Sequence, residues 1–276
     1  MRRWSLMILI FGIILAMAGC GRIQLRVTLR DHSPGNHQSP TEILLTEPAT
    51  EQTIPPITQP HITVPTAPLH SQWYISGISA DDVITYFNEV ALDTEFASGT
   101  GDAKLVQKWD QPIYYMLEGN YTTNDRYIIR EFVDFFNSMT GSPGMYETTN
   151  PGERNLRICF TDSQGIVDIL GNNLEGADGG VTYWYDNDRI YDSTICITTY
   201  LEGTQRRSVI LEELYNGTGL SQDTILRTDS LIYSYSDDAQ WMTPVDQLLL
   251  MLLYHPQIQP GMNATQCEQV IRSLYY

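Results

Sequence analysis

A short segment past the middle of the chain, Val209–Asp223, carries residues whose types and spacing could do chemistry. Glu212 and Asn216 are four residues apart, so a helix through this segment would place both side chains on one face. Glu213 follows the first of them, and a positioned carboxylate can act as a general base that takes a proton from water. If the protein is an enzyme, we therefore expect Glu213 to be its catalytic residue.

The side chains in this segment that could hold a metal ion offer only oxygen atoms. Glu212, Asn216 and Asp223 would suit Ca²⁺, Mg²⁺ or Mn²⁺ better than Zn²⁺. Catalytic zinc normally takes three protein ligands, yet only His255 among the five histidines lies in the expected globular part. We therefore predict no metal and no cofactor. The other four histidines are His32, His37, His61 and His70.

A purely structural role for this segment is the alternative. The two glutamates can bond backbone donors of a sheet or pair with Arg206 or Arg207, and Asn216 can bond neighbouring main chain. Gly219 would then be the residue that ends the helix in a left-handed turn, as glycine commonly does.

The segment resembles the active-site helix of a metzincin-type zinc peptidase. Glu212 and Asn216 fall at the positions of two histidine ligands, and Glu213 falls at that of the catalytic glutamate. Gln222 stands at the position of the third histidine. Further similarities are an edge strand at Val181–Tyr185, a Met-turn at Ser230–Tyr233 with Ile232 in place of methionine, and a closing helix at Met242–Tyr254. The resemblance implies a zincin-like scaffold that lacks its zinc-binding histidines.

Other motifs are similar to those of a family of bacterial lipoproteins that carry a domain of unknown function. They span nearly the whole globular part, so the resemblance implies membership of that family, but it supplies no activity. The motifs are Tyr86–Leu92, Lys108-Trp109 with Pro112-Ile113, Glu212–Leu214, Gly219-Leu220 with Asp223, and Leu253–Pro256 with Pro260–Met262.

Hydrophobic spacing and turn residues predict strands that alternate with helices, followed by further helices. Ser79, Asn124, Thr243 and Asn263 are expected to cap helix N-termini. We therefore expect residues 73–276 to form one α+β domain, a zincin-like mixed β-sheet packed with several helices. The expected helices are 81–96, 124–139, 165–170, 205–218, 244–254 and 263–274; the expected strands are 112–118, 155–161, 181–185 and 189–200, the last two joined by a turn at 186–188.

The first residues resemble a bacterial lipoprotein signal. Two arginines precede Leu6–Ala18, an almost entirely apolar stretch that is short for a membrane span. Small residues then lead to Cys20, as in a lipobox. The resemblance implies removal of residues 1–19, acylation of Cys20 (palmitate included), and a place on the extracytoplasmic face of the cell membrane. Ordinary signal cleavage near Ala18 and an uncleaved anchor are the alternatives.

Residues 20–72 are expected to be a disordered tether that begins with the lipidated cysteine and is rich in proline and threonine. Eight prolines stand between residues 34 and 68 with no apolar period among them, so this stretch cannot bury enough surface to offset the entropy of ordering it. The chain has a formal net charge of −17, which argues against nucleic acid as a partner.

The remaining cysteines and an aromatic run leave alternatives open. Cys159, Cys196 and Cys267 show no metal-ligand spacing, and we expect small buried side chains. One disulfide among them is possible, but the sequence does not select the pair. Tyr183 and Trp184 could stack on sugars or line a groove, or they could simply alternate across a strand.

These features predict an extracytoplasmic, membrane-anchored lipoprotein of unknown activity, a non-catalytic binding or structural module. Its expected partners are the membrane, through the lipid anchor, and a peptide, protein or cell-wall polymer, with an extended peptide added at the exposed edge Val181–Tyr185. The alternative is a peptidase-like hydrolase that uses Glu213 as general base with an oxygen-ligated metal or none. The candidate binding residues are Glu212, Asn216, Asp223, Tyr183 and Trp184.

Overall fold

The computed structural model describes residues 22–25, 73–92, 105–236 and 238–275. The predicted signal peptide, Cys20 and most of the predicted tether lie outside these residues. Among the helices of the described ranges, none combines the length and the apolar character that crossing a membrane requires.

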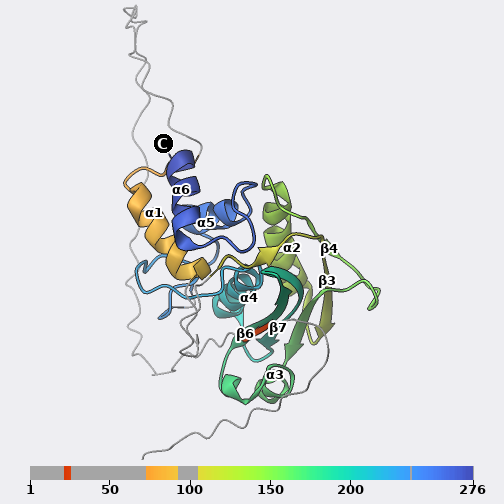
Figure 1. The fold of residues 1–276 in the computed structure, drawn as a ribbon. Helices are drawn as coiled ribbons and strands as arrows, with labels where there is room; N and C mark the ends of the chain where they lie inside the picture. Colours follow the sequence, from red (N-terminus) through yellow and green to blue (C-terminus); the bar gives the residue numbers. More distant parts are fainter. Residues whose placement is uncertain (1–21, 26–72, 93–104, 237, 276) are drawn as a thin grey trace, which may run out of the picture.

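A seven-stranded mixed sheet forms the centre of the domain (Figure 1). The strands follow the order β1-β6-β7-β5-β3-β4, and β2 pairs with β7 beyond this path. β2, β3, β4, β5 and β7 are paired in parallel, whereas β6 runs antiparallel to β7 and β1 antiparallel to β6. The strands are β1 (Arg22–Leu25), β2 (Lys108–Trp109), β3 (Ile113–Gly119), β4 (Met145–Glu147), β5 (Leu156–Thr161), β6 (Gly179–Asp186) and β7 (Arg189–Thr198).

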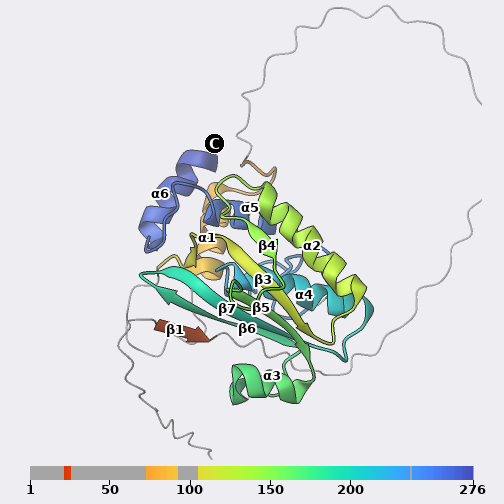
Figure 2. The ribbon, with the colours of Figure 1, turned by 90° about the vertical axis from the view of Figure 1, so that its right-hand side faces the viewer.

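Helices cover both faces of the sheet (Figure 2). α2 and α4 lie on one face and α3 on the other, while α1, α5 and α6 gather on the side of the domain away from α3. The α+β class and the mixed sheet packed with several helices are therefore confirmed. The helices are α1 (Ala80–Phe87), α2 (Thr123–Ser138), α3 (Ser163–Leu170), α4 (Gly203–Gly217), α5 (Pro244–Leu253) and α6 (Ala264–Tyr275), with a π-helical turn η1 (Asn88–Leu92) and a 3-10 turn η2 (Asn172–Leu174).

Three of the four predicted helix caps are confirmed. The side chains of Ser79, Thr243 and Asn263 each accept a hydrogen bond from the backbone N–H three residues further on. The prediction for Asn124 is wrong, because α2 begins earlier and Thr122 is its N-cap. Thr122 and the aspartate three residues later satisfy each other's backbone N–H groups, a reciprocal arrangement that a single asparagine cap does not provide.

Several predicted helix boundaries also differ from the structure by one or more residues; α4, for example, begins at Gly203 rather than at residue 205. The first predicted helix keeps α-helical geometry only to Phe87 and then continues as η1, and its last predicted residues, 93–96, lie outside the described part. The predicted helix at 165–170 starts earlier, at Ser163, because the Asp162 side chain accepts the N–H of Gly165 at 2.8 Å and caps it.

β6 and β7 form the predicted hairpin, but the outer edge of β6 is not exposed as expected. Asn187 and Asp188 make the turn with positive φ angles of 49° and 61°, which match the twist of a two-residue hairpin. On its other side, β6 pairs through Thr182–Tyr185 with Arg22–Leu25 of the same chain. The expectation of an unoccupied edge is therefore wrong, and its occupant comes from within the predicted tether.

Candidate functional site

α4, the helix that carries the candidate residues, is enclosed by the rest of the domain. Every residue from Ser208 to Gly217 is buried. Gly217 approaches the sheet so closely that a Cβ there would lie 3.1 Å from the side chain of Ile195 in β7. On the α5 side, the Tyr215 hydroxyl donates to the carbonyl of Asp246 at 2.8 Å. Because a helix buried all round is usually apolar, the polar residues of α4 need a physical account.

Glu212 and Glu213 lie inside the protein rather than on a solvated cleft. Each is 1 % exposed. Glu213 lies against β6 at Gly179, where a Cβ would come within 2.9 Å of the glutamate Oε1. The glycine therefore makes room for the carboxylate. A general base must reach the water or substrate from which it takes a proton, so this burial favours a structural role for the two glutamates.

Asn216 is fully buried on the same helix. Within the described part of the chain, neither its side-chain Oδ1 nor its Nδ2 has a hydrogen-bond partner. The expected bond from this side chain to neighbouring main chain is therefore not found. A buried amide without hydrogen-bond partners costs about 1–3 kcal/mol of folding stability. Asn216 therefore makes the folded domain less stable.

Arg206 and Arg207 do not pair with the α4 glutamates, contrary to one of the alternatives above. Arg206 binds the Asp125 carboxylate of α2 through Nε at 2.7 Å and Nη2 at 2.8 Å. Arg207 binds Glu131 of the same helix at 2.7 Å. Burial opposes ionisation of Asp125, but hydrogen bonds from Arg206 and Thr122 outweigh it and lower the pKa of this carboxyl. The arginines therefore join α4 to α2.

Arg206 also organises the chain that leads into α4. Its Nη1 donates to the carbonyls of Thr198, Thr199 and Leu201 at 3.2–3.3 Å. Its guanidinium lies 5.3 Å from the centre of the Phe160 ring. One buried side chain thus holds the end of β7, the connection after it and the start of α2 together.

The other candidate binding residues do not share one surface with the α4 residues. Tyr183 is buried, and its hydroxyl donates to Gln107 Oε1 at 3.3 Å. Trp184 is half-buried and points to the opposite face of the sheet, since neighbouring residues of a strand alternate. Asp223 is half-buried in the segment that follows α4. The structure therefore brings together Glu212, Glu213 and Asn216 on one helix, and it separates Trp184 from them.

The described residues offer few histidines that could bind a metal, since His255 is the one histidine among them. No group of three or more His, Cys, Asp and Glu side chains there is arranged to hold a metal ion. His255 instead meets the ring of Trp73 edge to face at 5.4 Å. Burial, and then the nearby charge of Lys108, lowers its pKa. This histidine packs against an aromatic ring and feels a nearby positive charge.

The end of α4 is fastened by residues that belong to the motifs of the lipoprotein resemblance. Trp109 donates its indole N–H to the carbonyl of Gly217 at 2.9 Å, and the Tyr254 hydroxyl donates to the carbonyl of Thr218 at 2.8 Å. Gly219 ends the helix with a φ of 110°, as predicted, and a Cβ there would lie 2.2 Å from the carbonyl oxygen of Gln107. Trp109 and Tyr254 thus donate hydrogen bonds to carbonyls at the C-terminus of α4 that have no donor within the helix.

Lys108, in the same motif, fastens α5. It is 6 % exposed, and its ammonium donates to the carbonyls of Leu253 at 2.8 Å and Ile258 at 2.5 Å. Burial lowers its pKa to about 8. A cation at the C-terminal end of a helix is favourable, so the structure assigns Lys108 a structural task.

The segment that resembles a Met-turn is held to α5 by one carboxylate. Ile232, at the position of the methionine, is completely buried. Asp246 accepts hydrogen bonds from the Ser230 hydroxyl at 2.6 Å and the Leu231 N–H at 3.0 Å. The same carboxylate accepts both the N–H and the hydroxyl of Thr243 at 2.8 Å. Asp246 therefore caps α5 and holds this turn at the same time.

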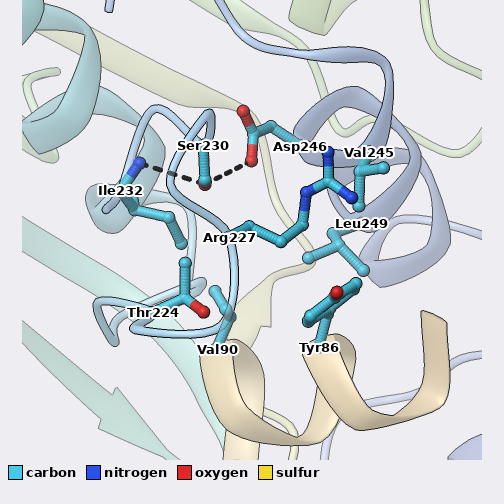
Figure 3. A pocket seen from close by; sticks show the side chains of 9 residues that line it. All are labelled: Tyr86, Val90, Thr224, Arg227, Ser230, Ile232, Val245, Asp246 and Leu249. Carbon is cyan, nitrogen blue, oxygen red and sulfur yellow. Dashed lines mark hydrogen bonds between the residues drawn. The ribbon is translucent and has the colours of Figure 1, made fainter. Parts of the chain in front are cut away.

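A small hollow opens beside this turn, between α1, α5 and the 224–232 segment (Figure 3). Arg227 crosses it, and its guanidinium lies 5.6 Å from the ring centre of Tyr86. Figure 3 shows the Ser230 hydroxyl directed at Asp246, so these two polar groups are used within the protein. Much of the remaining lining is apolar.

Sequence reasoning missed the two buried carboxylates that organise the site, Asp125 and Asp246. Both stand three residues after a capping threonine, and this capping-box spacing is a local signal that could have marked them. Their second partners, Arg206 and the 230–231 turn, are 81 and 15–16 residues away in the chain. No local pattern identifies such partners.

The fold and site define a single α+β domain built around one enclosed helix with buried carboxylates. The chain belongs to the family described as "Protein of unknown function (DUF2927)", whose model matches residues 80–273. Membership of a family of unknown function is thus confirmed. No curated protein matches the chain.

Proposed function

We propose that this protein is an extracytoplasmic, membrane-anchored lipoprotein whose domain is a non-catalytic binding module for extended peptide segments. The pairing of β1 with β6 is the observation that carries this proposal. A segment about 160 residues away in the chain adds to an edge strand through its backbone. That arrangement is the geometry of recognition by strand addition.

The burial of α4 supports the proposal that the domain is not catalytic. Glu212 and Glu213 are each 1 % exposed, and the helix is fixed at its start by Arg206 and at its end by Trp109 and Tyr254. On a zincin-like scaffold this helix would carry the reacting groups. Here its polar side chains are enclosed, and the antiparallel pairing of β1 on the outer side of β6 supports retention of that scaffold for binding.

The membrane anchor in this proposal is supported by the sequence alone. Met17–Cys20 follows the apolar stretch Leu6–Ala18, and acyl chains on Cys20 would supply the anchor. β1 begins at Arg22, two residues further on, so the β6 edge would lie close to the lipid. We expect the wild type to incorporate labelled palmitate and the Cys20→Ser variant to incorporate none.

The backbone groups of β7 alternate between its two neighbours. The N–H of Ser193 donates to the carbonyl of Asn155, on the β5 side, at 2.9 Å. The N–H of Thr198 donates to the carbonyl of Asp178, on the β6 side, at 2.9 Å. Since successive residues of a strand turn their backbone groups to opposite sides, the odd-numbered residues of β7 from Ser193 onward face β5 and the even-numbered residues face β6; the register shift at Trp184/Tyr185 lies before this stretch.

This alternation fixes which residues of β1 donate to β6. Tyr183 is the register partner of Ser193, whose backbone faces β5, so Tyr183 turns its own N–H and C=O away from β7 and toward β1. Gln24 is the partner of Tyr183, and its N–H therefore faces β6. The N–H of Ile23 points away from β6.

Gln24→Pro is expected to weaken the pairing of β1 with β6 and so expose the outer edge of β6. Ile23→Pro is the matched control. Proline has no N–H, so it removes a pairing bond only at position 24. The probe is a fluorescent peptide of residues 21–27, titrated by anisotropy into the full chain in detergent. We expect at least about tenfold tighter binding to Gln24→Pro than to the wild type, because the competing strand no longer occupies the edge. Equal affinities for wild type and both variants would remove the proposed peptide site.

A further inference from the structure

Two of the three described cysteines lie side by side in the sheet. Cys159 of β5 and Cys196 of β7 are direct register partners in a parallel pair. Neighbouring strands are about 4.8 Å apart, and this spacing lies within the range of roughly 4.4–6.8 Å between Cα atoms that a disulfide spans. Both are free thiols in this structure. The sequence left the pair undetermined, and the register now selects it.

The two thiols share a small apolar compartment that α3 and η2 close over the sheet, on the face away from α4 (Figure 2). Cys159 is 5 % exposed and Cys196 is fully buried. Of the cysteines in the described ranges, only these two lie in the compartment, because Cys267 lies on α6 in the main core. Its other buried side chains are Ile166, Leu170, Leu174 and Ala177.

The surroundings make the two thiols chemically unequal. The Arg157 guanidinium lies 3.9 Å from the Cys159 sulfur, and a bond of 2.8 Å to Glu118 fixes its orientation. A hydrogen bond from Cys196, aided by the Arg157 charge and opposed by burial, lowers the pKa of Cys159 to about 7. The same hydrogen bond and burial raise the pKa of Cys196. Burial also raises the pKa of Cys267, to about 11. Cys159 is thus the thiol best able to react as a thiolate.

We infer that Cys159 and Cys196 form a reversible oxidation site, closed by a disulfide that joins β5 to β7. With hydrogen peroxide as oxidant, the Cys159 thiolate attacks one peroxide oxygen, the O–O bond breaks, and Cys159 sulfenic acid and hydroxide form. The Cys196 sulfur then attacks the Cys159 sulfur, the S–O bond breaks, and water leaves with the Cys196 proton. In sum, two thiols and one peroxide give one disulfide and two waters. A dithiol reductant reverses the change.

Peptide mapping of the full chain, purified in detergent and fully reduced, tests this inference. The reduced protein is treated with hydrogen peroxide or buffer, alkylated and cut with trypsin without reduction. Cys159 falls in peptide Ile158–Arg189 and Cys196 in Ile190–Arg206. We expect peroxide to join these two peptides, with the loss of two hydrogens, and to lower their alkylation at least about tenfold more than that of the peptide with Cys267.

Two variants separate this site from general oxidation. Cys267→Ser should leave the joined peptide unchanged. Cys196→Ser removes the second thiol, so Cys159 should stop at the sulfenic acid and be captured by dimedone. The inference is overturned if the wild type keeps both thiols alkylated after peroxide, or if Cys159 links to Cys267 or to another molecule. The wild-type result decides even where a variant does not fold.

Discussion

Arg206→Met is expected to lower the free energy of unfolding by about 3–5 kcal/mol, since it leaves a buried carboxylate without its counter-charge. Asp125 is completely buried, and two of its hydrogen bonds come from this guanidinium. Three backbone carbonyls at the entrance to α4 would lose the same donor. Urea denaturation followed by circular dichroism measures the change.

Arg207→Met is the matched control for this change. The neighbouring arginine pairs with Glu131, but both side chains are partly exposed, 23 % and 33 %. Such pairs contribute at most about 1 kcal/mol. Similar losses in the two variants would show that Arg206 does not organise the domain as described.

The Asp125 carboxyl is expected to make the folded protein less stable at low pH. Its pKa is lowered in the folded protein, so its contribution is fully present above the unfolded pKa of about 3.9. That contribution is lost as the pH falls through the folded value. Wild-type stability should therefore decline on acidification below about pH 4 more steeply than that of an Asp125→Asn/Arg206→Met double variant.

Asp246→Ala is expected to lower the free energy of unfolding by about 3 kcal/mol or more. Hydrogen bonds to a buried carboxylate contribute about 1.5–3 kcal/mol each, and the buried donors left without an acceptor destabilise the folded protein further. The change removes the acceptor of Ser230, Leu231 and Thr243 at once. It should also release the 230–231 turn from α5, so trypsin should cut after Arg227 much faster than in the wild type. Urea denaturation and limited proteolysis provide the two readouts.

Asp82→Ala is the control for the capping part of that effect. Asp82 holds the same capping-box position in α1, where it bonds Ser79 in an exposed setting. It fastens no distant turn. We expect only a small fraction of the Asp246→Ala loss and no gain in cleavage after Arg227. If both variants behave alike, the dual role of Asp246 is wrong.

The sequence predicted the elements whose causes are local. Ser79 and Thr243 were identified as caps because each cap and the backbone it bonds lie within one turn of chain. The turn residues 186–188 likewise predict the hairpin of β6 and β7, and Gly219 alone predicts the end of α4. These features depend on backbone preferences that neighbouring residues set by themselves.

The arrangements that decide the site come from contacts distant in sequence. The sequence offers the nearby Glu212 and Glu213 as one possible pair of partners for Arg206, whereas its actual partner, Asp125, is 81 residues away. The burial of Glu213 depends on α4 crossing the sheet at Gly179, which helix periodicity cannot reveal. The pairing of Cys159 with Cys196 requires the strand order and register. β1, at Arg22–Leu25, was missed because four residues carry too little pattern to stand out from the stretch around them.

A non-catalytic binding domain requires that the enclosed α4 carboxylates do no catalysis. The most direct test compares folded full-length wild type with Glu213→Gln in hydrolysis of casein and of peptidoglycan, with and without added Ca²⁺, Mg²⁺, Mn²⁺ or Zn²⁺. We predict rates for both proteins that equal the protein-free blank under every condition. Turnover by the wild type that Glu213→Gln abolishes, while stability stays the same, would contradict this account and make Glu213 a general base.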